Sequence, residues 1–80
     1  MITVLQSGGM RFVIYQNDHQ PAHVHVYGDG DARIDIVEVS LLSHRGMSKR
    51  DLSRAKAVVF EHRSMLLAKW EEIHVTARNH

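Results

Sequence analysis

The chain has 80 residues, which is enough for one domain over residues 1–80 and too few for two. Hydrophobic residues make up 44% of it and charged residues 24%, a balance typical of a folded globular protein and unlike that of a disordered tail. The formal net charge of +1 is too small to hold nucleic acid by bulk attraction. The absence of cysteine excludes disulfides, thiolate metal sites and cysteine nucleophiles, so any metal site must use histidine and carboxylate ligands.

The sequence shows no sign of a membrane segment. No apolar run approaches the roughly 20 residues that cross a bilayer. The first residues also lack the basic and then apolar layout of a signal peptide. We therefore expect a cytoplasmic protein with no membrane partner.

The first half of the sequence predicts four strands in two hairpins. Two β-prone runs flank Gly8-Gly9 in ITVLQSGGMRFVIY, and glycine supplies the positive φ that a tight turn needs. Two further runs, AHVHVY at 22–27 and ARIDIV at 32–37, flank a turn-forming Gly-Asp-Gly-Asp segment. Alternation along the strands predicts an apolar face and an opposite, polar face. The apolar face would hold Val24, Val26, Ile34 and Ile36, and the polar face His23, His25, Tyr27, Arg33 and Asp35.

The second half predicts helix. Ser48 and Asp51 resemble a capping box, so we expect the helix to begin at residue 48 or 49. The apolar stripe consists of Leu52, Ala55, Val59, Leu66, Trp70 and Ile73. One helix of about 26 residues would be roughly 40 Å long, whereas a compact domain of this size is about 30 Å across. Either the helix breaks near residues 61–64, or its end packs on another subunit.

The predicted fold class is therefore α+β, a small antiparallel sheet of about four strands with a long or broken C-terminal helix packed on one face. Phe60 and Leu67 lie outside the main apolar stripe and have surface left to bury. We expect a homodimer through this region of the helix, or a complex with another small protein.

Three histidines, His19, His23 and His25, lie within seven positions and suggest a metal site. Alternate residues of a strand are roughly 6.5 to 7 Å apart on one face, so two imidazoles can converge on one ion. His23 and His25 meet this condition, and the bend at Pro21 could bring His19 or Asp18 as the third ligand. The alternative is a polar face that is only solvated or covered by a partner.

A metal-free site is a further alternative. Histidine transfers protons near neutral pH, and RNA cleavage needs a base, an acid and a cation for the phosphate. His23, His25 and Arg33 could fill these roles, with Tyr27 or Tyr15 stacking on a base. A basic run could contact phosphates or could simply be a solvated helix face. This run contains Arg45, Lys49, Arg50, Arg54 and Lys56.

The segment NDHQPAHVHV, residues 17–26, resembles the signature N-D-H-x-P-P-H-x-H-V of a bacterial family catalogued as domain of unknown function 4160. GGMRFVIY before it, and GMSKRDL with Leu66, Leu67 and Trp70 after it, are also similar to that family's layout. Ala22 stands where a second proline is usual. The signature positions of this sequence are Asn17, Asp18, His19, Pro21, His23, His25 and Val26.

Members of this family are often encoded beside another small protein, and such pairs look like toxin-antitoxin modules. The resemblance thus implies a toxin-antitoxin component with a small cognate partner. We expect a toxin that acts on RNA, with His23 and His25 as acid and base and with His19 and Asp18 assisting. The expected substrate-binding residues are Arg33, Tyr27, Arg45, Lys49 and Arg50. The alternatives are a non-enzymatic antitoxin or interaction module that binds a protein or operator DNA, and an enzyme with a divalent metal on His19, His23 and His25.

Overall fold

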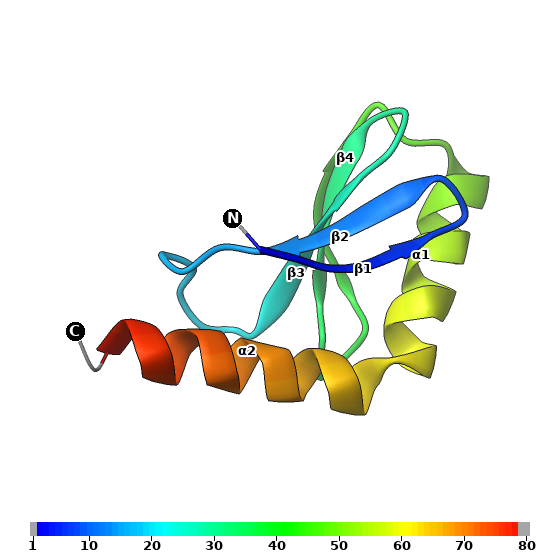
Figure 1. Cartoon of the computed structure of the whole chain (residues 1–80). Helices are drawn as coiled ribbons and strands as arrows, with labels where there is room; N and C mark the ends of the chain where they lie inside the picture. The colour runs from blue at the N-terminus through cyan, green and yellow to red at the C-terminus, as the bar shows by residue number, and fades with distance from the viewer. Residues whose placement is uncertain (1, 79–80) are drawn as a thin grey trace.

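The chain forms one antiparallel sheet followed by two helices, as a computed structural model of residues 2–78 shows, with side chains described through residue 75 (Figure 1). The sheet has the order β1-β2-β3-β4-β5, so each strand pairs with its neighbours in sequence. The expected α+β class is confirmed. The elements are β1 (Ile2–Ser7), β2 (Met10–Ile14), β3 (His23–Tyr27), β4 (Asp31–Asp35), β5 (Leu41–Arg45), α1 (Lys49–Glu61) and α2 (Arg63–Arg78).

The sheet has five strands rather than about four, because residues 41–45 form the edge strand β5. The sequence LLSHR of this strand has no clear apolar alternation and ends in basic residues. An edge strand gains much of its stability from backbone pairing with its single neighbour. It can therefore form without a clear alternation of apolar and polar side chains. Here β5 pairs antiparallel with β4, with Arg45 opposite Asp31.

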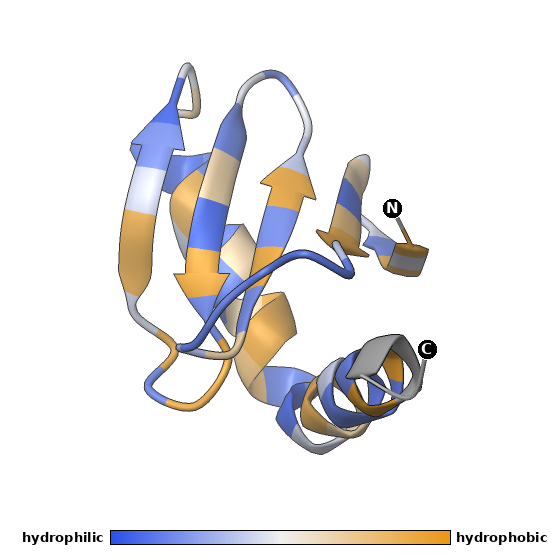
Figure 2. Cartoon of the chain, turned by 90° about the vertical axis from the view of Figure 1, so that its left-hand side faces the viewer, coloured by the Kyte–Doolittle hydropathy of each residue, from blue (hydrophilic) through white to orange (hydrophobic). Residues whose placement is uncertain are grey.

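The register of β3 and β4 fixes which side chains share a face. Val24 pairs with Ile34, and both are fully buried. On either side of this pair along the strands, His23 is opposite Asp35, and His25 is opposite Arg33. The predicted division into an apolar and a polar face is therefore confirmed for these strands. Figure 2 shows the underlying alternation of hydrophobic and hydrophilic residues along the strands as orange and blue bands.

The helix breaks at His62, between α1 and α2. This is the first of the two expected alternatives, a break near residues 61–64. Ser48 caps α1, and its hydroxyl accepts a hydrogen bond of 3.1 Å from the Asp51 amide. After the break, α2 turns and passes below one end of the sheet (Figure 1). This turn lets Leu66 and Trp70 reach the core, with exposures of 0% and 2%.

The core lies between the helices and the apolar face of the sheet. Its largest members are Phe12, Ile14, Ile34, Ile36, Leu66 and Trp70. Phe60 of α1 remains outside it, with 65% of its surface exposed. Within residues 2–78, no helix has the length and apolar character needed to span a membrane.

Candidate functional site

The segment of residues 15–22 connects β2 to β3 and crosses in front of the sheet, on the side away from α1 (Figure 2). Asp18 closes a turn within it, since its amide donates to the Tyr15 carbonyl at 3.1 Å and its Oδ2 accepts from the Tyr15 amide at 3.1 Å. The Gln20–Pro21 peptide bond is cis, and the Ala22 carbonyl accepts from the Ile36 amide at 2.9 Å. The segment is thus anchored at both ends and directs Asp18 toward the first residues of β3.

Asp18, His23 and His25 form a cluster whose ligand atoms all lie within 4.8 Å of one another. Nε2 of His25 is 3.1 Å from Oδ1 and 3.2 Å from Oδ2 of Asp18. Nε2 of His23 is 3.6 Å from the same Oδ1. Side-chain exposures of 13%, 8% and 19% for Asp18, His23 and His25 show a cluster that is mostly shielded from water but still reachable.

The hydrogen bond that Nδ1 of His23 makes sets the tautomer of this histidine. Nδ1 lies 2.8 Å from the carbonyl oxygen of Pro21, which can only accept, so Nδ1 carries the hydrogen and donates it. In the neutral ring, Nε2 then presents a lone pair to the carboxylate of Asp18. Two acceptors that face each other in a shielded place are favourable only with a positive species between them, either a proton or a metal ion.

Two tyrosines support His25 from the sides. The ring of Tyr15 meets the imidazole edge-on, with centroids 4.6 Å apart, and the ring of Tyr27 lies parallel to it at 6.5 Å. The tyrosine hydroxyls are 2.7 Å apart. The hydrogen bond of its hydroxyl to Tyr15, followed by burial and the nearby charge of Asp31, raises the pKa of Tyr27 to about 12, although Arg11 over its ring acts in the opposite direction. Tyr27 therefore stays neutral and packs against its neighbours.

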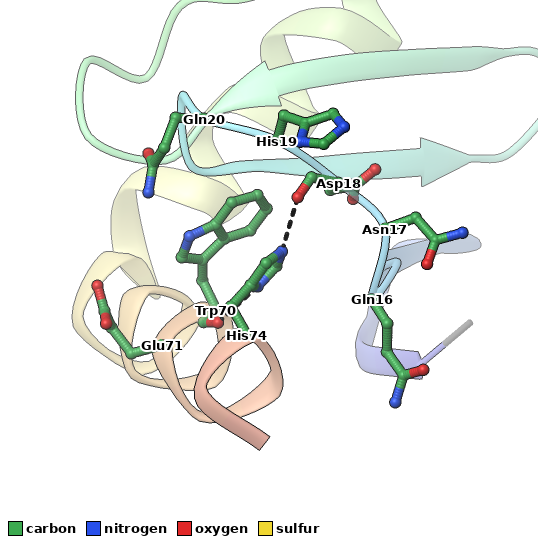
Figure 3. A pocket seen from close by; sticks show the side chains of 8 residues that line it. All are labelled: Gln16, Asn17, Asp18, His19, Gln20, Trp70, Glu71 and His74. Carbon is green, nitrogen blue, oxygen red and sulfur yellow. Dashed lines mark hydrogen bonds between the residues drawn. The ribbon is translucent and has the colours of Figure 1, made fainter. Parts of the chain in front are cut away.

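His74 of α2 also contacts this site, although the sequence analysis did not identify it. Its Nε2 is 2.9 Å from the carbonyl oxygen of Asp18, and its Nδ1 is 2.8 Å from that of Trp70 (Figure 3). Its ring stacks on Trp70 with centroids 3.8 Å apart. Both carbonyls can only accept, so a ring nitrogen of His74 that carries a hydrogen donates it to one of them. His74 thereby links the last helix to the backbone of the cluster.

The structure separates the predicted site residues into two groups. It brings Asp18, His23 and His25 together, whereas His19 is exposed and outside the cluster. Arg33 lines a hollow of about 380 Å³ together with Asp18 and His23, and its Nε donates to the Ser43 hydroxyl at 2.9 Å. A second hollow, of about 410 Å³, lies between the segment of residues 15–22 and α2 (Figure 3).

Asp35 lies opposite His23, but its carboxylate hydrogen-bonds to the backbone after β4. It is 7% exposed, and its Oδ1 accepts from the amides of Val37 and Glu38 at 2.8 and 2.9 Å. This carboxylate therefore closes the turn after β4. Aspartate side chains often accept hydrogen bonds from backbone amides a few residues further on in a turn, and Asp35 does the same here.

The basic candidates Arg45, Lys49 and Arg50 lie at the opposite end of the sheet and are exposed. Arg45 is opposite Asp31, which in turn is opposite Tyr27 at the last position of β3. His23 occupies the first position of that strand, about 13 Å away at 3.3 Å per residue. These cations therefore do not border the cluster.

The fold and the site define a small α+β domain with a carboxylate and two imidazoles at one end of an antiparallel sheet. The family model described as domain of unknown function (DUF4160) matches residues 9–71, which is most of the chain. The chain belongs to this family, and the assignment predicted from the histidine motif is confirmed. The matched range contains the whole cluster and ends before His74. No curated protein and no solved structure matches the chain.

Proposed function

We propose that this protein is the toxin component of a toxin-antitoxin module and that it cleaves RNA at the Asp18–His23–His25 cluster. The observation that carries the proposal is the convergence of two imidazoles and one carboxylate beside a hollow that Arg33 also lines. The toxin-antitoxin context comes from the family resemblance of the histidine motif. The cognate partner would be a small protein that prevents RNA from reaching the cluster.

RNA carries its own nucleophile, so cleavage needs few groups from the protein. A base removes the proton of a 2′-hydroxyl, the 2′-oxygen bonds to phosphorus, and the bond from phosphorus to the 5′-oxygen breaks. The departing 5′-oxygen receives the proton that the base removed, which leaves a 2′,3′-cyclic phosphate and a 5′-hydroxyl. In this reading the cluster supplies the base.

The position of Arg33 supports a role in phosphate binding. It lines the same hollow as Asp18 and His23, and its bond to the Ser43 hydroxyl is exposed to solvent. A neutral partner of this kind is readily exchanged for an anion, because hydrogen bonds between charged groups are about twice as strong as neutral ones. Arg33 would thus hold the scissile phosphate and stabilise the charge that develops on it.

The test is induced expression in cells, with growth and total RNA followed in the same cultures. Wild type is compared with His25→Ala, and with His44→Ala as the matched control, because His44 is an exposed histidine of β5. We expect growth arrest and RNA breakdown with wild type and His44→Ala, and neither with His25→Ala. Purified wild-type protein should then give RNA fragments that end in a 2′,3′-cyclic phosphate.

Two outcomes would overturn the proposal. Normal growth with all three proteins would favour the non-enzymatic alternative, an antitoxin or interaction module. Arrest that persists in a folded His25→Ala variant would separate toxicity from the cluster. Far-UV circular dichroism of the purified variants shows whether they are folded.

A further inference from the structure

We propose that Asp18, His23 and His25 bind one divalent first-row transition metal ion, such as Zn²⁺ or Mn²⁺. The role assigned to this ion rests on the function proposed above, whereas its binding can be tested alone. His19, the other histidine of the motif, is not a ligand in this proposal because it is exposed and lies outside the cluster.

The distances within the cluster are close to those of a metal site. Ligand atoms at about 2.0 to 2.2 Å from one ion, with angles of about 90° to 110°, are about 2.8 to 3.6 Å apart. The distances from Asp18 Oδ1 to Nε2 of His25 and of His23 are 3.1 and 3.6 Å. The two imidazoles also remain within 4.8 Å of each other at their ligand atoms. Side-chain rotation would have to bring the two imidazole nitrogens to the spacing that one ion requires.

Nδ1 of His23 has the kind of hydrogen-bond partner that a metal-binding histidine usually has, a carbonyl oxygen. Histidine ligands usually donate their other N–H to a carbonyl or carboxylate, which fixes the tautomer and aims the free nitrogen at the ion. His23 does this with the carbonyl oxygen of Pro21 at 2.8 Å. Its Nε2 then faces Asp18 Oδ1 at 3.6 Å, acceptor to acceptor, and a cation between them would remove that repulsion.

Asp18 is held in place before any ion binds. The Tyr15 amide donates to Oδ2, the Asp18 amide donates to the Tyr15 carbonyl, and His74 contacts the Asp18 carbonyl at 2.9 Å. Oδ1 is the oxygen shared by the two imidazoles. Fixing the ligands in advance lowers the entropy lost on binding, so this arrangement favours a site with measurable affinity.

Nitrogen and oxygen ligands without thiolate favour divalent first-row transition ions. Three protein ligands leave at least one position for water, and the adjoining hollow offers space for a substrate. When Zn²⁺ is the bound ion, it can lower the pKa of its bound water to about 7, which would supply a hydroxide near neutral pH. In RNA cleavage this hydroxide would take the proton of the 2′-hydroxyl and become water again. The base expected in the cluster is then the hydroxide on the ion.

The first experiment titrates metal-free, untagged full-length protein with Zn²⁺ by isothermal calorimetry. We expect one ion per chain, binding at least about 100-fold weaker in Asp18→Asn and His25→Ala, since even outer contacts of metal ligands account for about 10- to 100-fold. His19→Ala is the matched control, because this exposed residue is next to Asp18, and it should change the affinity less than about threefold. Absence of saturable binding, or equal losses in His19→Ala and His25→Ala, would overturn the proposal.

A second measurement needs no variant and so does not depend on mutant folding. X-ray absorption of the Zn²⁺-loaded wild type should show two imidazoles and oxygen ligands around the ion. One imidazole, or three or more, would contradict the assigned ligands. Binding of Zn²⁺ without RNA cleavage would leave the metal site standing and remove the proposed function. Cleavage that continues in fully metal-free protein would leave the proposed function standing and remove the role of the ion in it.

Discussion

The two ends of the sheet are built in different ways. At the site end, which comprises residues 15–22, the start of β3 and α2, half-buried polar side chains contact one another and the backbone. At the far end, which comprises the turn of residues 28–31, Gly46 and the start of α1, backbone segments approach closely and the charged side chains are exposed. Charged residues occur at both ends, so residue type alone does not locate a site. The burial of the side chains and their hydrogen-bond partners locate it.

Trp70 is the residue on which the site end should depend most. It is 2% exposed, and its ring stacks on His74 and packs against His23 at a centroid distance of 5.4 Å. We expect Trp70→Ala to lower the free energy of unfolding by about 3 to 5 kcal/mol, measured by urea denaturation. Phe60→Ala is the control, because this aromatic residue is 65% exposed and should change stability by about 0.5 kcal/mol or less. Similar losses in the two variants would contradict the described core.

Gly30 tests the far end. A Cβ at this position would overlap the carbonyl oxygen of Arg45 and the backbone of Gly46, neither of which can move as a side chain does. Gly30→Ala should therefore lower the free energy of unfolding by about 1 to 3 kcal/mol. In Gly28→Ala the new Cβ would lie 3.2 Å from the flexible Met10 side chain, so a change within about 1 kcal/mol is expected. Urea denaturation measures both variants. An unchanged free energy of unfolding in Gly30→Ala would mean that the turns at Gly30 and Gly46 are farther apart than described.

Most of the fold follows from local patterns in the sequence. Alternation in β3 and β4 predicts which side chains enter the core, and the cap at Ser48 predicts where α1 begins. The length of the apolar stripe requires either a break or a projecting end, and the break occurs at His62. β5 was missed, because an edge strand with basic and polar residues depends on its pairing with β4 more than on its own sequence.

The candidate site could be predicted only in part. Spacing on one strand places His23 and His25 on the same face, but it cannot choose between Asp18 and His19 as the third group. That choice depends on the turn that Asp18 makes with Tyr15, which directs its carboxylate toward β3. His74 is 56 residues from Asp18 in sequence, and their contact exists only because α2 changes direction after α1.

His74 provides a measure of how strongly α2 supports the cluster. His74→Phe keeps a ring to stack on Trp70 and removes the hydrogen bond to the Asp18 carbonyl. We expect a loss of about 1 kcal/mol in the free energy of unfolding, and Zn²⁺ binding about 10-fold weaker by calorimetry. His74→Gln retains a donor and should restore most of the affinity. If both variants bind Zn²⁺ like the wild type, α2 contributes to stability alone.

The tyrosine pair gives the expected pH dependence. The hydrogen bond to Tyr15 is the largest cause of the raised pKa of Tyr27, so Tyr15→Phe should lower that pKa from about 12 toward 10.0. Because the folded state favours neutral Tyr27, its contribution to stability is complete below pH 10 and is lost as the pH rises to about 12. Tyrosinate absorbance of Tyr15→Phe, which contains Tyr27 as its single tyrosine, measures the change. An unchanged midpoint would show that burial, the next cause, dominates.

The smallest effects are expected from the basic residues of the far end, and they test where RNA binds. Each phosphate contact that is lost from a single strand should reduce the slope of log K against log salt by about 0.7. Arg33→Ala should show this reduction, since Arg33 lines the hollow beside Asp18 and His23. Lys49→Ala/Arg50→Ala should leave the slope unchanged, because both side chains are exposed away from the cluster. The opposite result, about 1.4 for the double variant and none for Arg33→Ala, would place the RNA at the far end. The cluster would then lie about the length of β3 from the bound phosphates, too far to act on them.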